Sequence, residues 1–406
     1  MNAPTTATAD PHPHPRAGGE HDGRPSLSSR LPRPWAFPLL AYASTWILTL
    51  GVWAWLGDRN VAQVPSVERR KYHGWQLHFV FKDASNYLDV ARFGYPDHLP
   101  LAADGSVKAN NTAFFPLLPM LVKAVAVPLG GRYVLAALIV SVVLGAASAF
   151  AVWKLADHLR GRRIADRAVL LYCLFPGAFV FGYLYSESLA ALLAAFCLLA
   201  LVKRQWLLAG VLAGVGTAVR PNMVALCAAC AVAAAVAIHR ERDWRSLWAP
   251  LLSPIGGAAY LIWGTVRYDD ARFWFKTQDQ GWDQHTDWGV DTVKRVLWLD
   301  PDVRAEPAQN AVHTIFFVLA VVGVVWLLQE KFPPAVTVFT LGVLLLSFTA
   351  SAQGSKPRFV WTAFPLFIAA GVRLRGRVLA AVLVAFAVGF VWLAAWSPLH
   401  YGRGAP

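Results

Sequence analysis

The sequence predicts an all-α polytopic membrane protein with about eleven transmembrane helices plus a re-entrant or interfacial segment. Of its 406 residues, 56% are hydrophobic and only 15% are charged, whereas soluble domains carry about 25% charged residues. The apolar residues fall in long blocks, and about 20 apolar residues cross the hydrocarbon layer as a helix. Basic residues gather in the short loops between these blocks, which is the positive-inside pattern of membrane proteins.

The apolar blocks define the expected spans. They cover residues 35–56, 132–156, 167–184, 186–202, 206–219, 221–238, 248–267, 311–329, 334–350, 358–371 and 377–396. Whether 206–219 and 358–371 cross the membrane completely stays open from the sequence. Residues 1–34 are rich in Pro, Gly, Ser and His and contain no apolar stretch. We therefore expect a disordered cytoplasmic tail over 1–34, followed by a single transmembrane domain over 35–400.

The segment 113–129 decides the topology. Pro116 and Pro119 remove backbone donors, which disfavours a continuous helix, and Lys123 interrupts the apolar run. If the segment crosses the membrane, the basic loop at 160–167 falls outside; if it re-enters or lies at the interface, every short basic loop falls inside. We therefore expect that the segment does not span the membrane and that it lines a cavity. Irregular backbone at membrane depth is tolerated only where protein or a water-filled cavity covers it.

This topology places two long polar loops outside the plasma membrane. The first outer loop covers residues 57–112, and the second outer loop covers residues 268–310. Because all cytoplasmic loops are short, a functional site is expected on the extracytoplasmic face. The net charge of +13 then indicates membrane lipids with anionic headgroups as partners, and not nucleic acid.

The cysteines do not indicate a redox or metal site. Cys173, Cys197, Cys227 and Cys230 all lie inside apolar blocks, where cysteine acts as a small packing residue. Cys227 and Cys230 have zinc-like spacing but lack a second ligand pair. His285 lies in no recognisable metal spacing either, so we assign no metal ligand.

Two acidic residues at the expected outer boundary are candidates for catalysis. Asp83 and Tyr87 share one face of a short predicted helix, and a carboxylate there can act as a general base. The alternative for Asp83 is a solvated acid on a loop helix. Glu187, beside Ser186, lies between two apolar blocks, where a carboxylate needs water or a partner. It either contributes to a site or ends a helix hairpin.

Basic and aromatic residues could complete a binding site. Arg220, Lys356 and Arg358 stand at outer helix ends, where such side chains commonly reach the lipid headgroups. If they converge on one cavity they could bind a phosphate, because guanidinium groups bind phosphate oxygens bidentately. Gln278 and Trp282 belong to an aromatic and amide-rich stretch that suits sugar recognition or an interfacial aromatic belt equally well.

Several short motifs, in their order and spacing, resemble the PIG-V family of membrane mannosyltransferases. The resemblance extends over residues 80–370. The similar pieces are Asp83–Tyr95, Ala113–Pro119 with Phe115, Phe175-Pro176, Tyr185–Ser188, Thr217–Pro221, Gln278, Trp282, Pro357-Arg358 and Phe364-Pro365. The family usually has Arg-Trp before the aspartate, and this chain has Phe81-Lys82 instead.

The resemblance implies a GT-C-type fold and an inverting transfer of mannose from a polyprenyl-phosphate donor, with no metal, nucleotide sugar or other cofactor. The family's aspartate falls on Asp83, which is then the catalytic base. The expected roles are catalysis by Asp83 and Glu187, binding of the donor phosphate by Arg220 and Arg358 with Lys356 behind them, and substrate binding by Tyr87, Phe115, Ser186, Gln278 and Trp282.

Three alternatives remain open from the sequence. The donor could carry arabinose or glucose, or the protein could transport or flip lipid-linked sugars. The span interiors are nearly free of ionisable groups, which favours chemistry at the surface over passage through the membrane. The sequence leaves the acceptor open among a lipid, a glycan and a protein.

Overall fold

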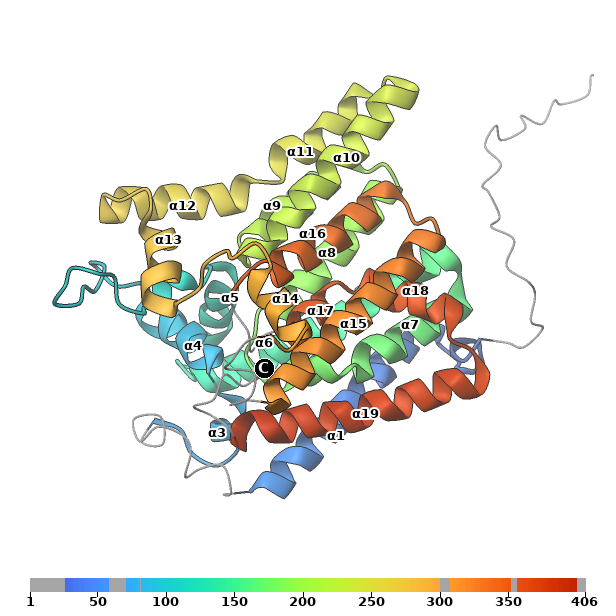
Figure 1. The fold of residues 1–406 in the computed structure, drawn as a ribbon, viewed down its shortest axis with the longest axis horizontal. Helices are drawn as coiled ribbons and strands as arrows, with labels where there is room; N and C mark the ends of the chain where they lie inside the picture. The colour runs from blue at the N-terminus through green and yellow to red at the C-terminus, as the bar shows by residue number, and fades with distance from the viewer. Residues whose placement is uncertain (1–25, 58–70, 81, 300–306, 352–355, 400–406) are drawn as a thin grey trace, which may run out of the picture.

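The computed structural model describes residues 26–57, 71–80, 82–299, 307–351 and 356–399 (Figure 1). Within these ranges the ordered elements are helices, and β pairing is limited to two isolated bridges, Leu101–Val107 and Thr286–Ala350. In the same ranges, 6 helices are long and apolar enough to cross a membrane, or 7 if one bent pair forms a single span. The chain is therefore the expected all-α, multi-pass membrane protein.

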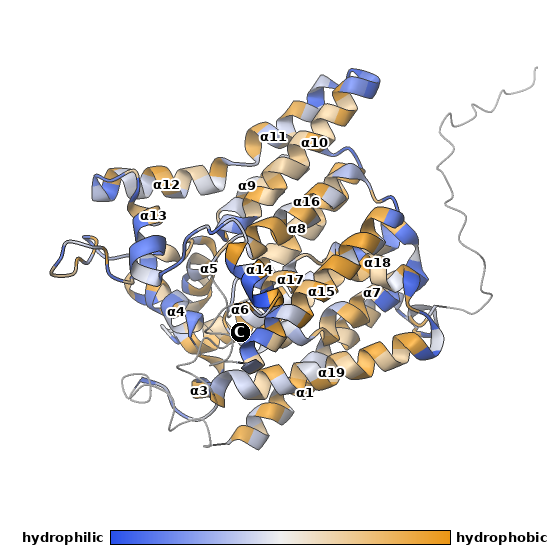
Figure 2. Ribbon diagram, in the orientation of Figure 1, coloured by the Kyte–Doolittle hydropathy of each residue, from blue (hydrophilic) through white to orange (hydrophobic). Residues whose placement is uncertain are grey.

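The long helices coincide with expected spans. They are α1 (Phe37–Leu56), α6 (Tyr133–Arg160), α10 (Val224–Glu241), α11 (Trp248–Leu252) with α12 (Ile255–Tyr268), α15 (Pro307–Gln329) and α19 (Gly376–Leu399). Apolar residues follow these helices along their length, whereas polar residues gather at their ends and around α13 (Phe273–Lys276) (Figure 2).

The remaining apolar segments are shorter or broken. They are α7 (Arg162–Leu174) with the 3₁₀ helix η5 (Pro176–Gly182), α8 (Glu187–Val202), α9 (Trp206–Thr217), α16 (Pro334–Phe348), α17 (Lys356–Thr362) and α18 (Pro365–Arg373). Proline causes two of the breaks. Pro176 follows the end of α7, and the chain bends there by 71°. Pro365 is the first residue of α18 and ends the preceding helix α17. The expected span 358–371 is therefore divided into two helices. The count of eleven complete spans stays a prediction.

Segment 113–129 contains α5 (Leu117–Ala126), a helix of 10 residues. At about 1.5 Å per residue it extends about 15 Å, half the thickness of the hydrocarbon layer. Its length therefore fits the non-spanning arrangement that the basic loops favour.

Two of the expected basic turns, those at Arg160 and Arg373, meet at Glu330. Arg160 donates to the carbonyl of Glu330, and Arg373 forms a 2.6 Å ion pair with the carboxylate of Glu330. In Figure 1 the turns that follow α15 and α18 lie on the right, and α4 (Asp83–Phe93) and α13 lie on the left. This arrangement agrees with the expected separation of basic turns from outer loops, and the orientation across the membrane stays a prediction.

The N-terminal segment differs from expectation over its last residues. Residues 1–25 lie outside the described part of the chain. Residues 26–34, expected within a disordered tail, include the 3₁₀ helix η1 (Ser28–Arg30). The Ser28 N–H donates to Asp166 Oδ2 at 2.8 Å, and Ser28 is fully buried. The buried carboxylate of Asp166 in α7 requires hydrogen-bond donors, and it therefore holds residues 26–34 against α7.

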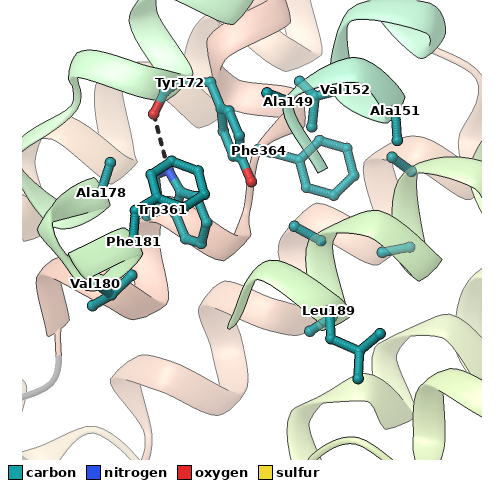
Figure 3. Packing of buried hydrophobic residues seen from close by; sticks show 14 of the residues in the cluster. Ala149, Ala151, Val152, Tyr172, Ala178, Val180, Phe181, Leu189, Trp361 and Phe364 are labelled. Atoms are coloured by element: carbon teal, nitrogen blue, oxygen red, sulfur yellow. Dashed lines mark hydrogen bonds between the residues drawn. The ribbon is translucent and has the colours of Figure 1, made fainter. Parts of the chain in front are cut away.

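The core fixes α17, the helix that carries Arg358. Trp361 stacks on Tyr172 of α7, with ring centroids 4.6 Å apart, and donates its indole N–H to the Tyr172 carbonyl at 2.9 Å (Figure 3). At Gly177 in η5, an added Cβ would lie 2.1 Å from the carbonyl oxygen of Pro357. This close approach requires glycine, and it holds the start of α17 against η5.

Candidate active site

A cavity of about 660 Å³ opens where α4, the start of α8, the start of α17 and the two outer loops meet. Its lining combines charged, amide and aromatic side chains, which suits a large polar ligand with an apolar part. All the predicted site residues except Lys356 line it. They are Asp83, Tyr87, Phe115, Ser186, Glu187, Arg220, Gln278, Trp282 and Arg358.

Two carboxylates and two guanidinium groups form the charged centre of this cavity. Arg358 Nη1 lies 2.7 Å from Asp83 Oδ2 and 3.6 Å from Glu187 Oε1. Arg220 Nη1 lies 2.9 Å from the same Glu187 oxygen. The side chain of Asp83 is 28% exposed, whereas that of Glu187 is 2% exposed. Asp83 can therefore meet a ligand directly, and Glu187 holds the two arginines together.

Asp83 is the first residue of α4, and its backbone neighbour is unusual. Lys82 adopts φ 47° and ψ −115°, a conformation that non-glycine residues rarely take and that tends to persist at functional sites. The helix N-terminus also stabilises a negative charge on Asp83. Burial lowers the pKa of Lys82 from 10.5 to about 8, although the charge of Asp83 opposes the shift.

Tyr87 joins α4 to the start of α8. Its hydroxyl donates to Ser186 Oγ at 2.9 Å, and Ser186 immediately precedes Glu187, the first residue of α8. Burial raises the pKa of Tyr87 well above its ordinary value, and the charge of Glu187 raises it further. Tyr87 therefore remains a neutral hydrogen-bond donor that fixes the distance between Asp83 and Glu187.

Aromatic rings flank both arginines. Arg220 precedes Pro221, which begins the 3₁₀ helix η6 (Pro221–Met223), so the chain is extended at the arginine. The ring of Phe359 lies 5.3 Å from the guanidinium carbon of each arginine. The ring centroid of Tyr185 lies 5.0 Å from the guanidinium carbon of Arg358. These rings restrict the guanidinium planes and add cation–π attraction.

Lys356 lies behind the cavity wall. It is 1% exposed, and its ammonium donates to the backbone carbonyls of Ser347 and Ala350. Those two residues line the cavity, but Lys356 does not. The structure therefore does not bring Lys356 to the position of a direct phosphate ligand, and a supporting role behind the arginines stays a prediction.

The second outer loop closes the far side of the cavity. Gln278 lies in the π-helix η8 (Thr277–Gly281) and donates to the Ala113 carbonyl at 3.5 Å. Trp282 donates its indole N–H to the Asn110 carbonyl at 3.1 Å. Both predicted residues thus lie on a wall that is joined to the first outer loop.

The prediction for segment 113–129 needs a correction. Only its start, Ala113, Phe114 and Phe115, lines the cavity, and α5 does not. Phe115 is 5% exposed and packs on Tyr260, with ring centroids 4.7 Å apart. The reason is that the residues just before α5 reach the cavity, while the helix packs its buried face on the core.

Several lining residues, among them Phe114, Asn222 and Arg272, were not among the site residues predicted from the sequence. Phe114 stands beside Phe115 in one motif, and sequence spacing cannot say which ring faces the cavity. Asn222 follows Arg220-Pro221, and its position after a predicted phosphate ligand was the available signal. Arg272 carries no distinguishing sequence signal.

Comparison with known proteins identifies a related fold. A family model described as dolichyl-phosphate-mannose-protein mannosyltransferase matches residues 115–263. A search of curated proteins gives no significant match. The crystal structure of ArnT from Cupriavidus metallidurans bound to undecaprenyl phosphate is similar at 15% identity and a TM-score of 0.51, over 85% of this chain and 62% of that chain.

The apo oligosaccharyltransferase from Archaeoglobus fulgidus aligns at 12% identity and a TM-score of 0.49, over 90% of this chain and 56% of that chain. This chain thus spans about three fifths of the length of these two structures. The match to ArnT concerns the architecture of the helices. Together with the apolar spans, it shows that this chain is a multi-pass membrane protein with a GT-C-type fold.

Proposed function

We propose that this protein is an inverting, metal-independent glycosyltransferase that moves mannose from a polyprenyl-phosphate donor to an acceptor on the extracytoplasmic face. One observation carries the proposal. The accessible carboxylate of Asp83 lies 2.7 Å from a guanidinium nitrogen of Arg358, inside a cavity that is large enough for a sugar and a phosphate.

The proposed reaction uses one carboxylate as a base. The acceptor hydroxyl oxygen attacks the anomeric carbon while Asp83 takes the hydroxyl proton. The bond between the anomeric carbon and the phosphate oxygen breaks on the opposite side, and the phosphate leaves with the bonding electron pair. The configuration at the anomeric carbon is inverted, and polyprenyl phosphate is the second product.

The arginines provide the charge stabilisation that the leaving phosphate needs. A phosphate leaving group is already acidic, so it requires positive charge more than a proton. Arg220 and Arg358 lie 2.9 Å and 3.6 Å from the same buried oxygen of Glu187. Glu187 therefore acts by holding the two guanidinium groups side by side, and Lys356 fixes the wall behind them.

The family match supports mannose as the transferred sugar. Its description names a dolichyl-phosphate-mannose donor, and the ArnT structure contains undecaprenyl phosphate. Both are consistent with a polyprenyl carrier in the apolar surroundings of this cavity.

The test is transfer by the purified full-length chain in lipid nanodiscs. Radioactive mannose, arabinose and glucose are each supplied on the same polyprenyl phosphate, with membrane extract as acceptor. We expect mannose to be incorporated fastest, with no dependence on added chelator. Faster incorporation of arabinose or glucose would replace the sugar in the proposal. Flipping of a fluorescent lipid-linked sugar by an Asp83→Ala variant that transfers nothing would favour a transporter.

A further inference from the structure

A line of aromatic rings runs from the proposed base to the second outer loop. Tyr87 lies one helical turn after Asp83 and contacts Phe114 edge to face, with ring centroids 5.0 Å apart at 75°. Phe114 contacts Trp282 in the same manner, at 5.6 Å and 83°. All three residues line the cavity. A ligand with its reactive hydroxyl at Asp83 would extend along these rings.

The polar side chains that the second outer loop contributes to the cavity include three amides, Gln278, Gln280 and Gln284, beside the charged Arg272, Lys276 and Asp279. Gln278 and Gln284 line the cavity beside Trp282, and Asn222 lines it near the arginines. Lys276, a cation on the same wall, is already bound to Asp270 at 2.7 Å. Aromatic faces pack against the C–H groups of a sugar, and amides both donate to and accept from hydroxyl groups. The outer wall thus has the chemistry of a glycan-binding surface.

Buried side chains hold this wall in place. Thr277 Oγ1 lies 3.0 Å from Thr112 Oγ1, and both threonines are 0% exposed. Asn110 Oδ1 accepts from the Thr112 hydroxyl at 2.6 Å and from its N–H at 2.9 Å. The Asn110 carbonyl in turn accepts from the Trp282 indole at 3.1 Å. This network fixes Trp282 through the first outer loop.

The backbone at the wall is irregular and closely packed. Thr277–Gly281 forms a π-helix, which is uncommon and frequent at functional sites. A Cβ added at Gly281 would lie 2.9 Å from the Ala109 nitrogen. The π-turn thereby places Gln278 and Trp282 on the cavity side.

We propose that the Phe114–Trp282 wall binds the sugar portion of the acceptor, and that Thr277 is a positioning residue for it. This inference rests on the proposed transferase function. The acceptor is then a glycan or glycolipid that presents a sugar hydroxyl to Asp83, and a peptide is excluded.

Transfer kinetics test the subsite directly. The purified chain receives saturating polyprenyl-phosphate mannose, with octyl mannoside, glucoside and galactoside as acceptor probes. Thr277→Val keeps the shape of the side chain but removes buried hydrogen bonds, so we expect its KM for the preferred glycoside to rise about tenfold. The KM for the donor stays within about twofold, and Thr277→Ser restores the glycoside KM because the hydroxyl returns.

The matched control is Thr265→Val. Its hydroxyl donates only within α12, to the Leu261 carbonyl at 2.8 Å, and Thr265 does not line the cavity. We expect wild-type kinetics from it. An unchanged glycoside KM in Thr277→Val, or no rescue by Thr277→Ser, overturns the positioning role.

Saturation-transfer NMR separates this inference from the proposed function. Methyl mannoside, methyl glucoside and methyl galactoside are added to the Asp83→Asn variant, with and without Trp282→Ala. We expect binding of at least one glycoside that Trp282→Ala removes. Binding without any transfer by the wild type overturns the transferase and leaves the subsite. Transfer to serine or threonine peptides, with no glycoside binding, overturns the subsite and leaves the transferase.

Discussion

Arg358 Nη1 lies 2.7 Å from Asp83 Oδ2, although 275 positions separate the two residues in the chain. The same nitrogen lies 3.6 Å from Glu187 Oε1. The proposed base and a proposed phosphate ligand are therefore paired with each other. A donor phosphate must therefore compete with the Asp83 carboxylate for Arg358.

Replacing Asp83 by Asn separates catalysis from donor binding. The variant lacks the proposed base, so we expect transfer to fall by about 10²- to 10⁴-fold. The variant also lacks the carboxylate that competes with the ligand for Arg358. The guanidinium can then make its charge-assisted hydrogen bonds to the phosphate instead. We therefore expect undecaprenyl phosphate to bind a few-fold more tightly. Initial rates and isothermal titration calorimetry measure the two effects.

The control for this variant is Asp97→Asn. Asp97 pairs with Arg267 at 2.7 Å, but the side chain of Asp97 is 89% exposed. We expect neither transfer nor undecaprenyl phosphate binding to change. Retention of most transfer by Asp83→Asn would contradict the assignment of the base.

Glu187→Gln tests whether the buried acid holds the two arginines. It leaves Arg220 without its carboxylate partner at 2.9 Å, whereas Arg358 keeps Asp83 at 2.7 Å. Breaking a buried ion pair by removing one partner costs about 3–5 kcal/mol. We expect a lower unfolding temperature and slower transfer. Undecaprenyl phosphate should raise the unfolding temperature more in the variant than in the wild type, because its phosphate replaces the missing charge.

The comparison for Glu187→Gln is Glu330→Gln at the opposite end of the helices. Glu330 pairs with Arg373 at 2.6 Å and is 19% exposed. The shift in unfolding temperature that undecaprenyl phosphate causes is measured for both variants. An equal ligand-induced shift in the two variants would show that Glu187 does not organise a phosphate site.

Much of the fold could be predicted from the sequence, because the hydrocarbon layer imposes length and apolar composition on each span. The spans beginning near residues 35, 132 and 377 appear as α1, α6 and α19. The expected span 358–371 begins with Arg358 and contains Pro365, and the structure divides it into α17 and α18. Hydropathy alone does not distinguish one bent span from two short helices.

The site was harder to predict than the fold. Tyr87 follows Asp83 at helical spacing, so their shared face is a local property that the sequence contains. The contact between Asp83 and Arg358 depends on packing of distant helices, such as Trp361 against Tyr172, and it has no periodic signal. The roles assigned to them came from ordered motifs, and these motifs could not reveal that the Lys356 ammonium is bound to the backbone carbonyls of Ser347 and Ala350.

Arg358→Lys tests the need for a planar cation between two carboxylates and a phosphate. An ammonium keeps the charge but lacks the bidentate geometry of a guanidinium. We expect the KM for the polyprenyl-phosphate donor to rise about tenfold or more, the equivalent of losing one charged hydrogen bond. Arg373→Lys, which alters an arginine paired at the far end, should leave the donor KM unchanged. Equal donor KM values in Arg358→Lys and wild type would argue against phosphate binding by Arg358.

Lys82 should give donor binding a pH dependence. Burial lowers the pKa of its ammonium from 10.5 to about 8, so the positive charge beside Asp83 and Arg358 is lost as the pH rises from 7 to 9. We expect the donor KM to increase a few-fold over that range, because the phosphate then meets less positive potential.

The folded protein binds fewer protons than the unfolded chain between pH 8 and 10.5, so this group makes folding more favourable as the pH rises there. Lys82→Met should show the high donor KM at every pH, and Lys82→Arg should keep the low one up to pH 9. Donor KM profiles of the three proteins measure this, and the same rise in Lys82→Arg would assign the titration to another group.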